Sequence, residues 1–128
     1  TMAENKEYYT QEMENGSIQI SEDVVASVTG MAVLEVEGVC GLSSSIGTDI
    51  AEMLGMKTLA RGVRLTPIKD GSVTIECDVV AKFGQSVFSL AKTVQDAVKT
   101  SVESITGLAV AQVNVNICGI AMPKELKK

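Results

Sequence analysis

The segment Ser72–Gly119 changes its apolar period twice, and this strongly limits the folds open to the chain. In residues 72–83 apolar and polar side chains alternate, which is the pattern of a strand with one buried face. The apolar spacing then becomes helical through residues 86–106, and Gly107 follows where a helix end favours a left-handed residue. Alternation returns in residues 111–117. This order predicts a strand, a helix and a second strand, with the helix packed on a sheet.

The apolar positions of this unit define its expected core. The first strand contributes Val73, Ile75, Cys77, Val79, Ala81 and Phe83. The helix contributes Val87, Leu90, Ala91, Val94, Ala97, Val98, Val102 and Ile105. The second strand contributes Ala111, Val113, Val115 and Ile117. We expect these side chains to meet between the helix and the sheet.

Upstream, the sequence indicates another strand, another helix and a short extended segment. Residues 17–20 alternate as a strand, and Ser21 is a favoured N-cap for a helix that continues to about Glu37. Residues 39–42 are expected to be extended. The expected apolar stripe of the helix is Val24, Val25, Val28, Met31, Ala32 and Val36.

A β-hairpin is expected between residues 62–68 and the alternating strand. The Asp70-Gly71 pair that separates them is typical of a tight hairpin turn. Residues 43–60 are expected to form a loop with a short helix that begins near Thr48.

These elements predict a two-layer α+β domain, with a mixed sheet of four to five strands and two main helices on one face. A chain of 128 residues suits one domain. We expect the domain to span residues 16–121. A polar flexible arm over residues 1–15, which tyrosines could dock, precedes it, and a basic tail over residues 122–128 follows it.

Composition excludes several classes of function. The chain has no His, which removes imidazole from acid–base catalysis, nucleophile activation and metal binding. Its net charge of −5 argues against general affinity for nucleic acid. No apolar run approaches the ~18 residues of a membrane span. Three widely spaced Cys fit a reducing cytoplasm. We expect no enzymatic activity, no cofactor and no metal.

One glycine pattern resembles a phosphate-binding loop and the cysteines resemble a zinc site, but each lacks an element that the site requires. Gly38, Gly41 and Gly47 flank a run of serines as in a phosphate-binding loop, yet Thr48 follows where such a loop needs Lys. The cysteines Cys40, Cys77 and Cys118 could meet across a sheet, but they lack the paired spacing of zinc sites. Cysteines packed in or near the core are expected instead.

A carboxylate pair, Glu76 and Asp78, shares the polar face of the predicted strand with Lys82. A catalytic pair needs a cleft that shifts one pKa. We therefore interpret these residues as a solvated face, or as a face that another chain covers.

Polar side chains on the long helix and the last strand form a candidate interaction surface. They are Lys92, Asp96, Lys99, Glu103, Gln112, Asn114 and Asn116. The helix charges form i,i+4 pairs, a pattern that also suits an ordinary solvated face. The strand amides could hydrogen-bond another chain without charge repulsion. If this strand or residues 62–68 form a sheet edge, their free backbone groups could pair with a partner.

A weaker candidate is a local basic patch. Its residues are Lys57, Arg61, Arg64 and Lys69. Such a patch could contact phosphate or anionic lipid headgroups.

Seven short motifs follow one another along residues 16–121. They are GSIQIS at 16–21, EVEGV at 35–39, RGV at 61–63, KFG at 82–84, VQDAV at 94–98, TGL at 106–108 and VNVNICG at 113–119. This ordered set resembles the alkaline shock protein family of Gram-positive bacteria, the small envelope stress response proteins. Phe83 stands where the family often has Tyr.

The resemblance implies a cytoplasmic protein without enzymatic activity. It further implies self-assembly, or association with the inner face of the membrane through a membrane-anchored partner. The family has no known catalytic residues, so none is assigned here. The expected function is that of an interaction or scaffold protein in envelope homeostasis. A small-ligand or lipid-binding domain is the alternative, and an enzyme that uses Ser and carboxylates is a further one.

Overall fold

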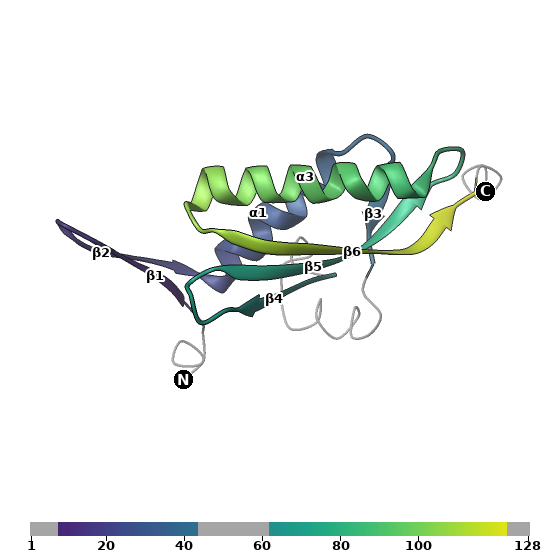
Figure 1. The fold of residues 1–128 in the computed structure, drawn as a ribbon. Coiled ribbons are helices and arrows are strands. Elements are labelled where there is room, and N and C mark those ends of the chain that lie inside the picture. Colours follow the sequence, from purple (N-terminus) through teal and green to yellow (C-terminus); the bar gives the residue numbers. More distant parts are fainter. Residues whose placement is uncertain (1–7, 44–61, 123–128) are drawn as a thin grey trace, which may run out of the picture.

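The computed structural model describes residues 8–43 and 62–122, which form two helices and six strands (Figure 1). The elements are β1 (Tyr8–Met13), β2 (Gly16–Ser21), α1 (Glu22–Glu35), β3 (Val39–Leu42), β4 (Val63–Pro67), β5 (Val73–Lys82), α3 (Val87–Thr106) and β6 (Val110–Ala121). The predicted two-layer α+β fold is confirmed. The predictions for residues 1–7, 44–61 and 123–128 lie outside the described residues.

The larger sheet is mixed and has β5 at its centre. β6 pairs in parallel with one side of β5 along its whole length, from Val73 opposite Val110 to Lys82 opposite Ala121. β4 and β3 pair antiparallel with β5 over different residues and follow each other along its other side. The sheet therefore has one edge of two short strands and one edge of a single long strand.

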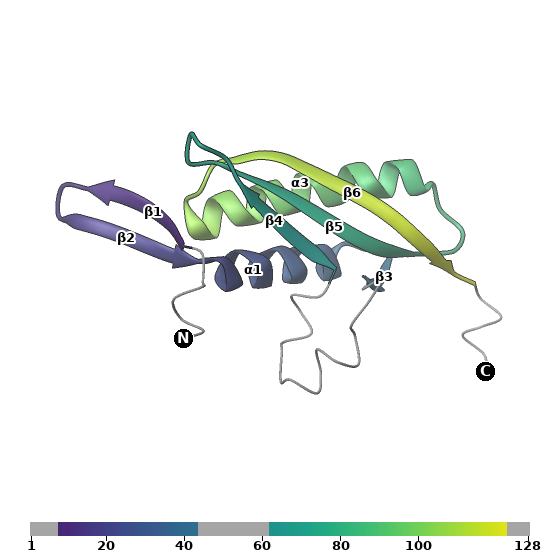
Figure 2. The same cartoon turned by 90° about the horizontal axis from the view of Figure 1, so that it is seen from below.

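Both helices pack on the same face of this sheet (Figure 2). The predicted apolar face of β5 is fully buried beneath them, as expected from its alternation. The residues of this face are Val73, Ile75, Cys77, Val79 and Ala81. Phe83 is an exception, because it lies past the end of β5 and is exposed. Ala111 is also exposed, since an irregularity in the β5–β6 register occurs at this residue.

The long helix α3 begins and ends as the sequence predicts. The Ser86 hydroxyl accepts a hydrogen bond from the Ser89 N–H at 3.2 Å, and Gly107 ends the helix in the left-handed region with φ of 77°. Its buried face consists of Leu90, Val94, Val98, Val102 and Thr106. Ile105 was predicted to join this face but is 68% exposed.

Helix α1 has its predicted N-cap but a different buried face. The Ser21 hydroxyl accepts a hydrogen bond from the Val24 N–H at 3.4 Å. Val24 and Met31 of the predicted stripe are exposed. The buried residues are Val25, Ala26, Thr29, Gly30, Ala32 and Val33. Apolar side chains surround most of this helix, so spacing alone does not identify its buried side.

Residues 8–13, which belong to the polar flexible arm expected over residues 1–15, form the strand β1. β1 pairs antiparallel with β2 in a hairpin that projects from one end of the domain (Figure 1). Tyr9 on β1 is buried in the core, and the Gln11 side-chain amide donates to the Gly107 carbonyl oxygen at 2.9 Å. These two contacts attach the hairpin to the domain.

The predicted β4–β5 hairpin is confirmed. Leu65 lies opposite Ile75, and Gly71 in the turn has φ of 93°, which favours glycine. One Asp70 carboxylate oxygen accepts from both the N–H and the hydroxyl of Ser72. These bonds lower the pKa of Asp70 and fix the turn.

Candidate functional site

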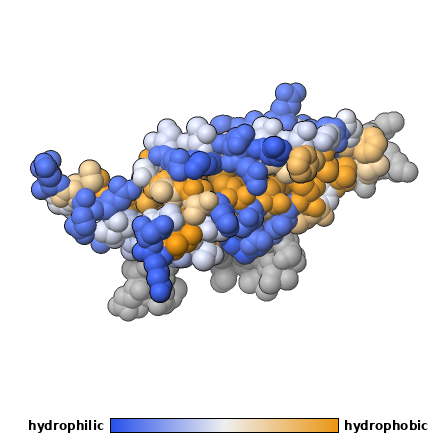
Figure 3. Space-filling view, viewed as in Figure 1, coloured by the Kyte–Doolittle hydropathy of each residue, from blue (hydrophilic) through white to orange (hydrophobic). Residues whose placement is uncertain are grey.

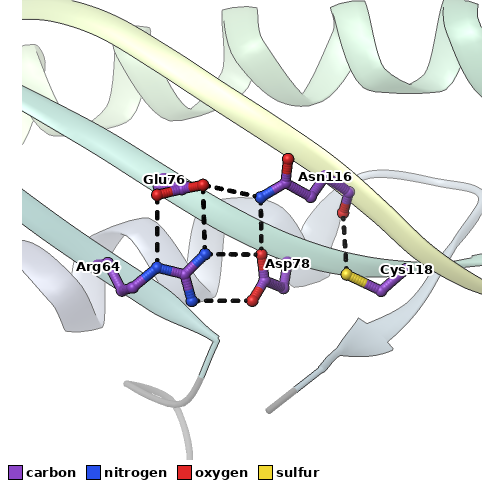
Figure 4. Close-up of polar contacts among 5 residues, drawn as sticks. All are labelled: Arg64, Glu76, Asp78, Asn116 and Cys118. Carbon is purple, nitrogen blue, oxygen red and sulfur yellow. Dashed lines mark hydrogen bonds and ion pairs between the residues drawn. The ribbon is translucent and has the colours of Figure 1, made fainter. Parts of the chain in front are cut away.

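Four polar side chains join three strands on the sheet face opposite the helices (Figure 4). Arg64 comes from β4, Glu76 and Asp78 from β5, and Asn116 from β6. The strand register explains their meeting, since Arg64 lies opposite Glu76 and Asp78 lies opposite Asn116. We call these four residues the polar cluster.

Asp78 is the most buried member of the polar cluster. Arg64 donates to its two carboxylate oxygens, from Nη1 at 2.9 Å and from Nη2 at 3.0 Å. The Arg64 Nη2 also lies 3.3 Å from the Glu76 carboxylate. The Asn116 amide donates to Glu76 at 3.0 Å and to Asp78 at 2.9 Å. Each carboxylate is therefore bound by both a guanidinium and an amide.

These contacts hold both carboxylates in their ionised form. The hydrogen bond from Arg64 is the main cause that lowers the pKa of Asp78. The pKa of Glu76 is lowered first by the hydrogen bond from Asn116 and then by Arg64. The same contacts raise the pKa of Arg64. An ionised carboxylate whose oxygens are already bonded suits a clamp between strands better than proton transfer.

The backbone of Asp78 also binds Ser43 and Gly62, the residues on either side of segment 44–61. The Ser43 N–H donates to the Asp78 carbonyl oxygen, and the Asp78 N–H donates to the Gly62 carbonyl oxygen, both at 2.8 Å. Residues that precede and follow this 18-residue segment thus meet on one residue of β5. The polar cluster therefore shares Asp78 with the backbone bonds to Ser43 and Gly62.

On α3, part of the candidate interaction surface turns out to contact the outer edge of β6. Lys99 and Glu103 form an ion pair of 3.1 Å, and Glu103 also accepts from the Val110 N–H at 3.0 Å. Gln95 donates to the Val113 carbonyl oxygen at 2.9 Å. These side chains satisfy backbone groups that the edge of a sheet would otherwise expose. We call Gln95, Lys99 and Glu103 the edge caps.

The bond from the Val110 N–H, followed by that from Lys99, lowers the pKa of Glu103. Next to the edge caps, a shallow groove of about 250 Å³ lies between α3 and β6. Asp96 lines this groove, and the Lys92 ammonium lies 5.7 Å from the centre of the Phe88 ring. Asn114 and Gln112 are exposed on β6, as predicted.

A second groove, of about 520 Å³, lies between the first turn of α1 and β4. Glu22 and Ala26 line it from the helix, and residues 63–66 line it from the strand. Its apolar side chains lie beside two carboxylates, Glu22 and Asp23, and beside Arg64, a lining that could hold a small molecule with both an apolar and a polar part. This groove is the place in the described residues that best suits the ligand-binding alternative.

The basic patch is not assembled in the described part of the chain. Arg64 contacts carboxylates, Lys69 lies beside the hairpin turn, and Lys57 and Arg61 lie outside the described residues. The sequence reading missed the partner of Asp78, because it compared that carboxylate only with Lys82 on the same strand. The hairpin turn was the signal that could have found Arg64, since it sets the register that places Arg64 opposite Glu76.

The cysteines do not come together. Cys77 is buried, and its burial raises the pKa of its thiol to about 12, while Cys40 and Cys118 are exposed on opposite sides of β5. Within residues 8–43 and 62–122, no group of His, Cys, Asp and Glu side chains could hold a metal ion. In the same residues, neither helix is long and apolar enough to cross a membrane.

Comparison with known proteins identifies relatives that share most of the chain. A model of the Asp23 family matches residues 10–122, and the family is described as having a cell envelope-related function. In this family name, Asp abbreviates alkaline shock protein and does not refer to an aspartate. The uncharacterized protein YqhY of Bacillus subtilis is 30% identical over 105 residues, which are 82% of this chain and 77% of YqhY.

Two streptococcal proteins extend the comparison. The uncharacterized protein Spy1535 of Streptococcus pyogenes is 32% identical over 112 residues, which are 88% of this chain and 84% of Spy1535. A stress response regulator gls24 homolog of the same species is 22% identical over 113 residues, 88% of this chain and 63% of that protein. No solved structure gives a significant match.

Proposed function

The chain belongs to the Asp23 family of alkaline shock proteins, and on that premise we propose that it is a non-enzymatic interaction protein of the envelope stress response. It works in the cytoplasm by binding copies of itself, a membrane-anchored protein, or both. Such a partner would bring it to the inner face of the membrane. Neither catalysis nor a bound cofactor enters this proposal.

One observation carries the proposal: the long edge strand β6 contains no charged residue. Its sequence, VAQVNVNICGIA, runs over 12 residues at one side of the sheet. Exposed edges often carry charged residues, Lys above all, or Pro, which discourage pairing with other chains. An uncharged edge of this length favours a protein whose sheet or adjoining helix binds another polypeptide.

The envelope-related description of the family and the stress regulator among its relatives support the cellular setting. The polar cluster supports a structural role for the only two carboxylates on the outer face of β5, because both are bonded by Arg64 and Asn116.

Affinity capture from the native cell tests this function, with membrane and soluble fractions analysed separately. We expect a defined protein partner, further copies of the chain, or both to be enriched. The control is the same capture after competition with an excess of untagged chain, which should remove any specific partner. Recovery of neither a partner nor further copies from either fraction would contradict the proposal.

The groove between α1 and β4 favours a second candidate, a carrier of a small ligand or lipid. Native mass spectrometry of the gently purified protein tests it. A ligand carrier would show an added mass at a fixed ratio to protein, and Leu65→Arg, which narrows the groove, should remove that mass. An unliganded mass in both proteins would count against this candidate.

A further inference from the structure

Only a short part of the β6 edge is both regular and uncovered. At the start of the strand, the edge caps bind the Val110 backbone and the Val113 carbonyl oxygen. Further on, the register of β6 against β5 shifts by one residue between Ile117 and Gly119. Such an irregularity bends the strand and ends regular pairing along it. The regular and uncovered stretch is therefore Val113–Ile117, which we call the open edge.

The open edge presents backbone groups that face no strand. Successive residues of a strand point their backbone groups to alternate sides. The Val113 carbonyl oxygen accepts from Gln95 on the outer side, so the N–H and C=O groups of Val115 and Ile117 point to that side as well. Within the described residues, β5 is the only strand that pairs with β6. Val115 and Ile117 can therefore bond to a further strand.

Helix α3 runs beside the open edge in the opposite direction. Glu103 binds Val110, and Gln95 binds Val113 further along β6, so the two elements are antiparallel. The row of the edge caps continues towards the start of the helix as far as Phe88. From Gln95 to Phe88 the helix rises about 10 Å, the length of about three strand residues. Phe88 therefore lies level with the far end of the open edge.

The side of α3 that adjoins the open edge is apolar and carries one positive charge. Phe88 is 73% exposed, although Phe is among the residues that proteins most often bury. Lys92 is the only charged residue from Phe88 to Gln95, and its ammonium lies 5.7 Å from the centre of the Phe88 ring. Figure 3 shows an apolar band over β6 and the adjoining side of α3, between hydrophilic rows. A strand added here would meet an aromatic ring and one cation.

We propose that the open edge binds an extended segment of another protein as an added strand, with an apolar side chain against Phe88 and a carboxylate near Lys92. Backbone bonds to Val115 and Ile117 supply affinity, and the side of α3 supplies specificity, as in other cases of strand addition. The open edge is about 16 Å long, which suits a short peptide segment. The inference rests on the proposed interaction function and names the surface and the chemistry of the partner.

Two features favour another protein over a second copy of the chain. β6 has no charged residue, so the β6 strand of a second copy cannot supply the carboxylate. The register shift after Ile117 restricts a two-fold pairing of β6 strands to the open edge. A two-fold axis there would bring the two α3 helices side by side in opposite directions, with each Lys92 near its own equivalent, and these like charges would repel.

A phage-displayed library of random eight-residue peptides, selected on the immobilised full chain, gives the first test. We expect the enriched peptides to combine apolar residues with Asp or Glu and to lack Pro, which cannot donate to a ladder. The same selection on the double variant Phe88→Ala/Lys92→Glu is the control and should not enrich them. No enrichment, or equal enrichment on the double variant, would overturn the inference. Peptides that repeat the uncharged sequence of β6 would assign the open edge to a second copy and would also overturn it.

Matched single variants locate the binding of a selected peptide, measured by fluorescence anisotropy. Phe88→Ala should raise the dissociation constant about tenfold or more, as for an aromatic residue central to an interface. Ile105→Ala changes a side chain that is 68% exposed at the other end of α3 and should leave it unchanged. Lys92→Glu should raise it about fivefold at low salt, whereas Lys69→Glu makes the same charge change at the hairpin turn and should not. With all four variants folded by circular dichroism, equal effects of variant and control would contradict the proposed surface.

Hydrogen exchange measures the backbone bonds directly. A saturating concentration of the selected peptide should slow exchange at the Val115 and Ile117 amides about tenfold or more, because these amides become donors to the added strand. The Asn114 and Asn116 amides point to β5 and serve as references. Unchanged exchange at Val115 and Ile117, or equal slowing at all four amides, would overturn strand addition. The interaction function would still stand if native capture recovers a protein partner, so the two failures are distinguishable.

Discussion

Arg64 and Asp78 face each other on adjacent strands and form two parallel hydrogen bonds, of 2.9 and 3.0 Å. The Asp78 side chain is 9% exposed, whereas that of Arg64 is 51% exposed. The pair is therefore a buried carboxylate held by a guanidinium that reaches it from the surface. Loss of the guanidinium leaves an ionised group with little access to water, and this asymmetry decides how the pair should respond to mutation.

We expect Arg64→Met to lower the free energy of unfolding by about 2 kcal/mol, since it leaves the Asp78 carboxylate without its main partner. The free energy of unfolding of Arg64→Lys should lie between those of Arg64→Met and the unaltered chain, because Lys keeps the charge but cannot donate in parallel to both oxygens. The double variant Arg64→Met/Asp78→Asn should regain part of the loss. Urea unfolding measures these three variants and also Asp78→Asn alone, which completes the cycle. Additive effects of the two single changes would show that the residues do not interact.

The polar cluster also predicts how stability depends on pH. In the folded chain the pKa values of Asp78 and Glu76 lie below their ordinary values of 3.8 and 4.5. The unfolded chain therefore binds protons more readily than the folded chain in this range. The stability from these groups is fully present above the unfolded values. It is lost as the pH falls from about 4.5 through the lower folded values.

Urea midpoints measured between pH 6 and about pH 2.5 should therefore fall less steeply for Asp78→Asn/Glu76→Gln than for the unaltered chain. Some slope should remain, because Asp70 and Glu103 have pKa values lowered by their own partners. Arg64→Met should also flatten the dependence of the urea midpoint on pH, since it removes the main cause of the lowered pKa of Asp78. Parallel profiles for all three proteins would contradict the assignment.

Two glycines test the close approach of Gly62 to Ser43 beside Asp78. Gly62 and Gly71 both have positive φ, of 77° and 93°. A Cβ at Gly62 would overlap the Ser43 carbonyl oxygen, whereas a Cβ at Gly71 would meet open space. Gly71→Ala should cost about 1 kcal/mol for its backbone conformation alone. Gly62→Ala should lower the free energy of unfolding by clearly more, because the backbone at Ser43 or Gly62 must move to make room for the Cβ. Equal thermal midpoints would show that Ser43 and Gly62 do not meet at Asp78.

The sequence predicted the fold correctly where the spacing of apolar residues agreed with a turn or cap residue at the end of the element. Alternation in β5, the Asp70-Gly71 turn, and Ser86 and Gly107 at the ends of α3 each depend on local chemistry, and the structure has all of them. The buried face of α1 could not be predicted in this way. Apolar residues occur nearly all round that helix, and packing against α3 and the sheet selects among them.

Contacts between distant residues account for what the sequence reading missed. The polarity of residues 8–13 suggested a flexible arm, yet Tyr9 enters the core and Gln11 binds Gly107, 96 residues away. The polar cluster depends on three strands and two registers, of which the sequence specified only the hairpin register. The edge caps depend on the placement of β6, which pairs in parallel with β5 and lies beside α3, and no local motif encodes this placement.

Position on α3 decides how an added charge is tolerated. Val94 is fully buried, while Ile105 on the same helix is 68% exposed. Val94→Asp places an unpaired carboxylate in the core and should cost more than about 3 kcal/mol, or unfold the domain. Ile105→Asp is the matched control and should change the free energy of unfolding by no more than about 0.5 kcal/mol. Similar urea midpoints for the two variants would show that the buried face of α3 is assigned incorrectly.

The last prediction concerns Glu103, which binds β6 as well as Lys99. Its carboxylate accepts from the Val110 N–H at 3.0 Å, and that N–H has no strand on its outer side among the described residues. Glu103→Ala should therefore speed hydrogen exchange at the Val110 amide, because the N–H becomes open to water. Glu103→Gln keeps an acceptor oxygen in place and should retain most of the protection.

The Leu90 N–H, which donates to the Ser86 carbonyl oxygen at 3.0 Å within α3, serves as the internal reference for this measurement. Exchange that rises equally at both positions would indicate general loosening of α3 rather than loss of one cap. Exchange at Val110 that is unchanged in Glu103→Ala would show that the carboxylate does not protect the edge. At Val110, the cover of the β6 edge would then rest on Lys99 alone, whose ammonium lies 3.4 Å from the Val110 carbonyl oxygen.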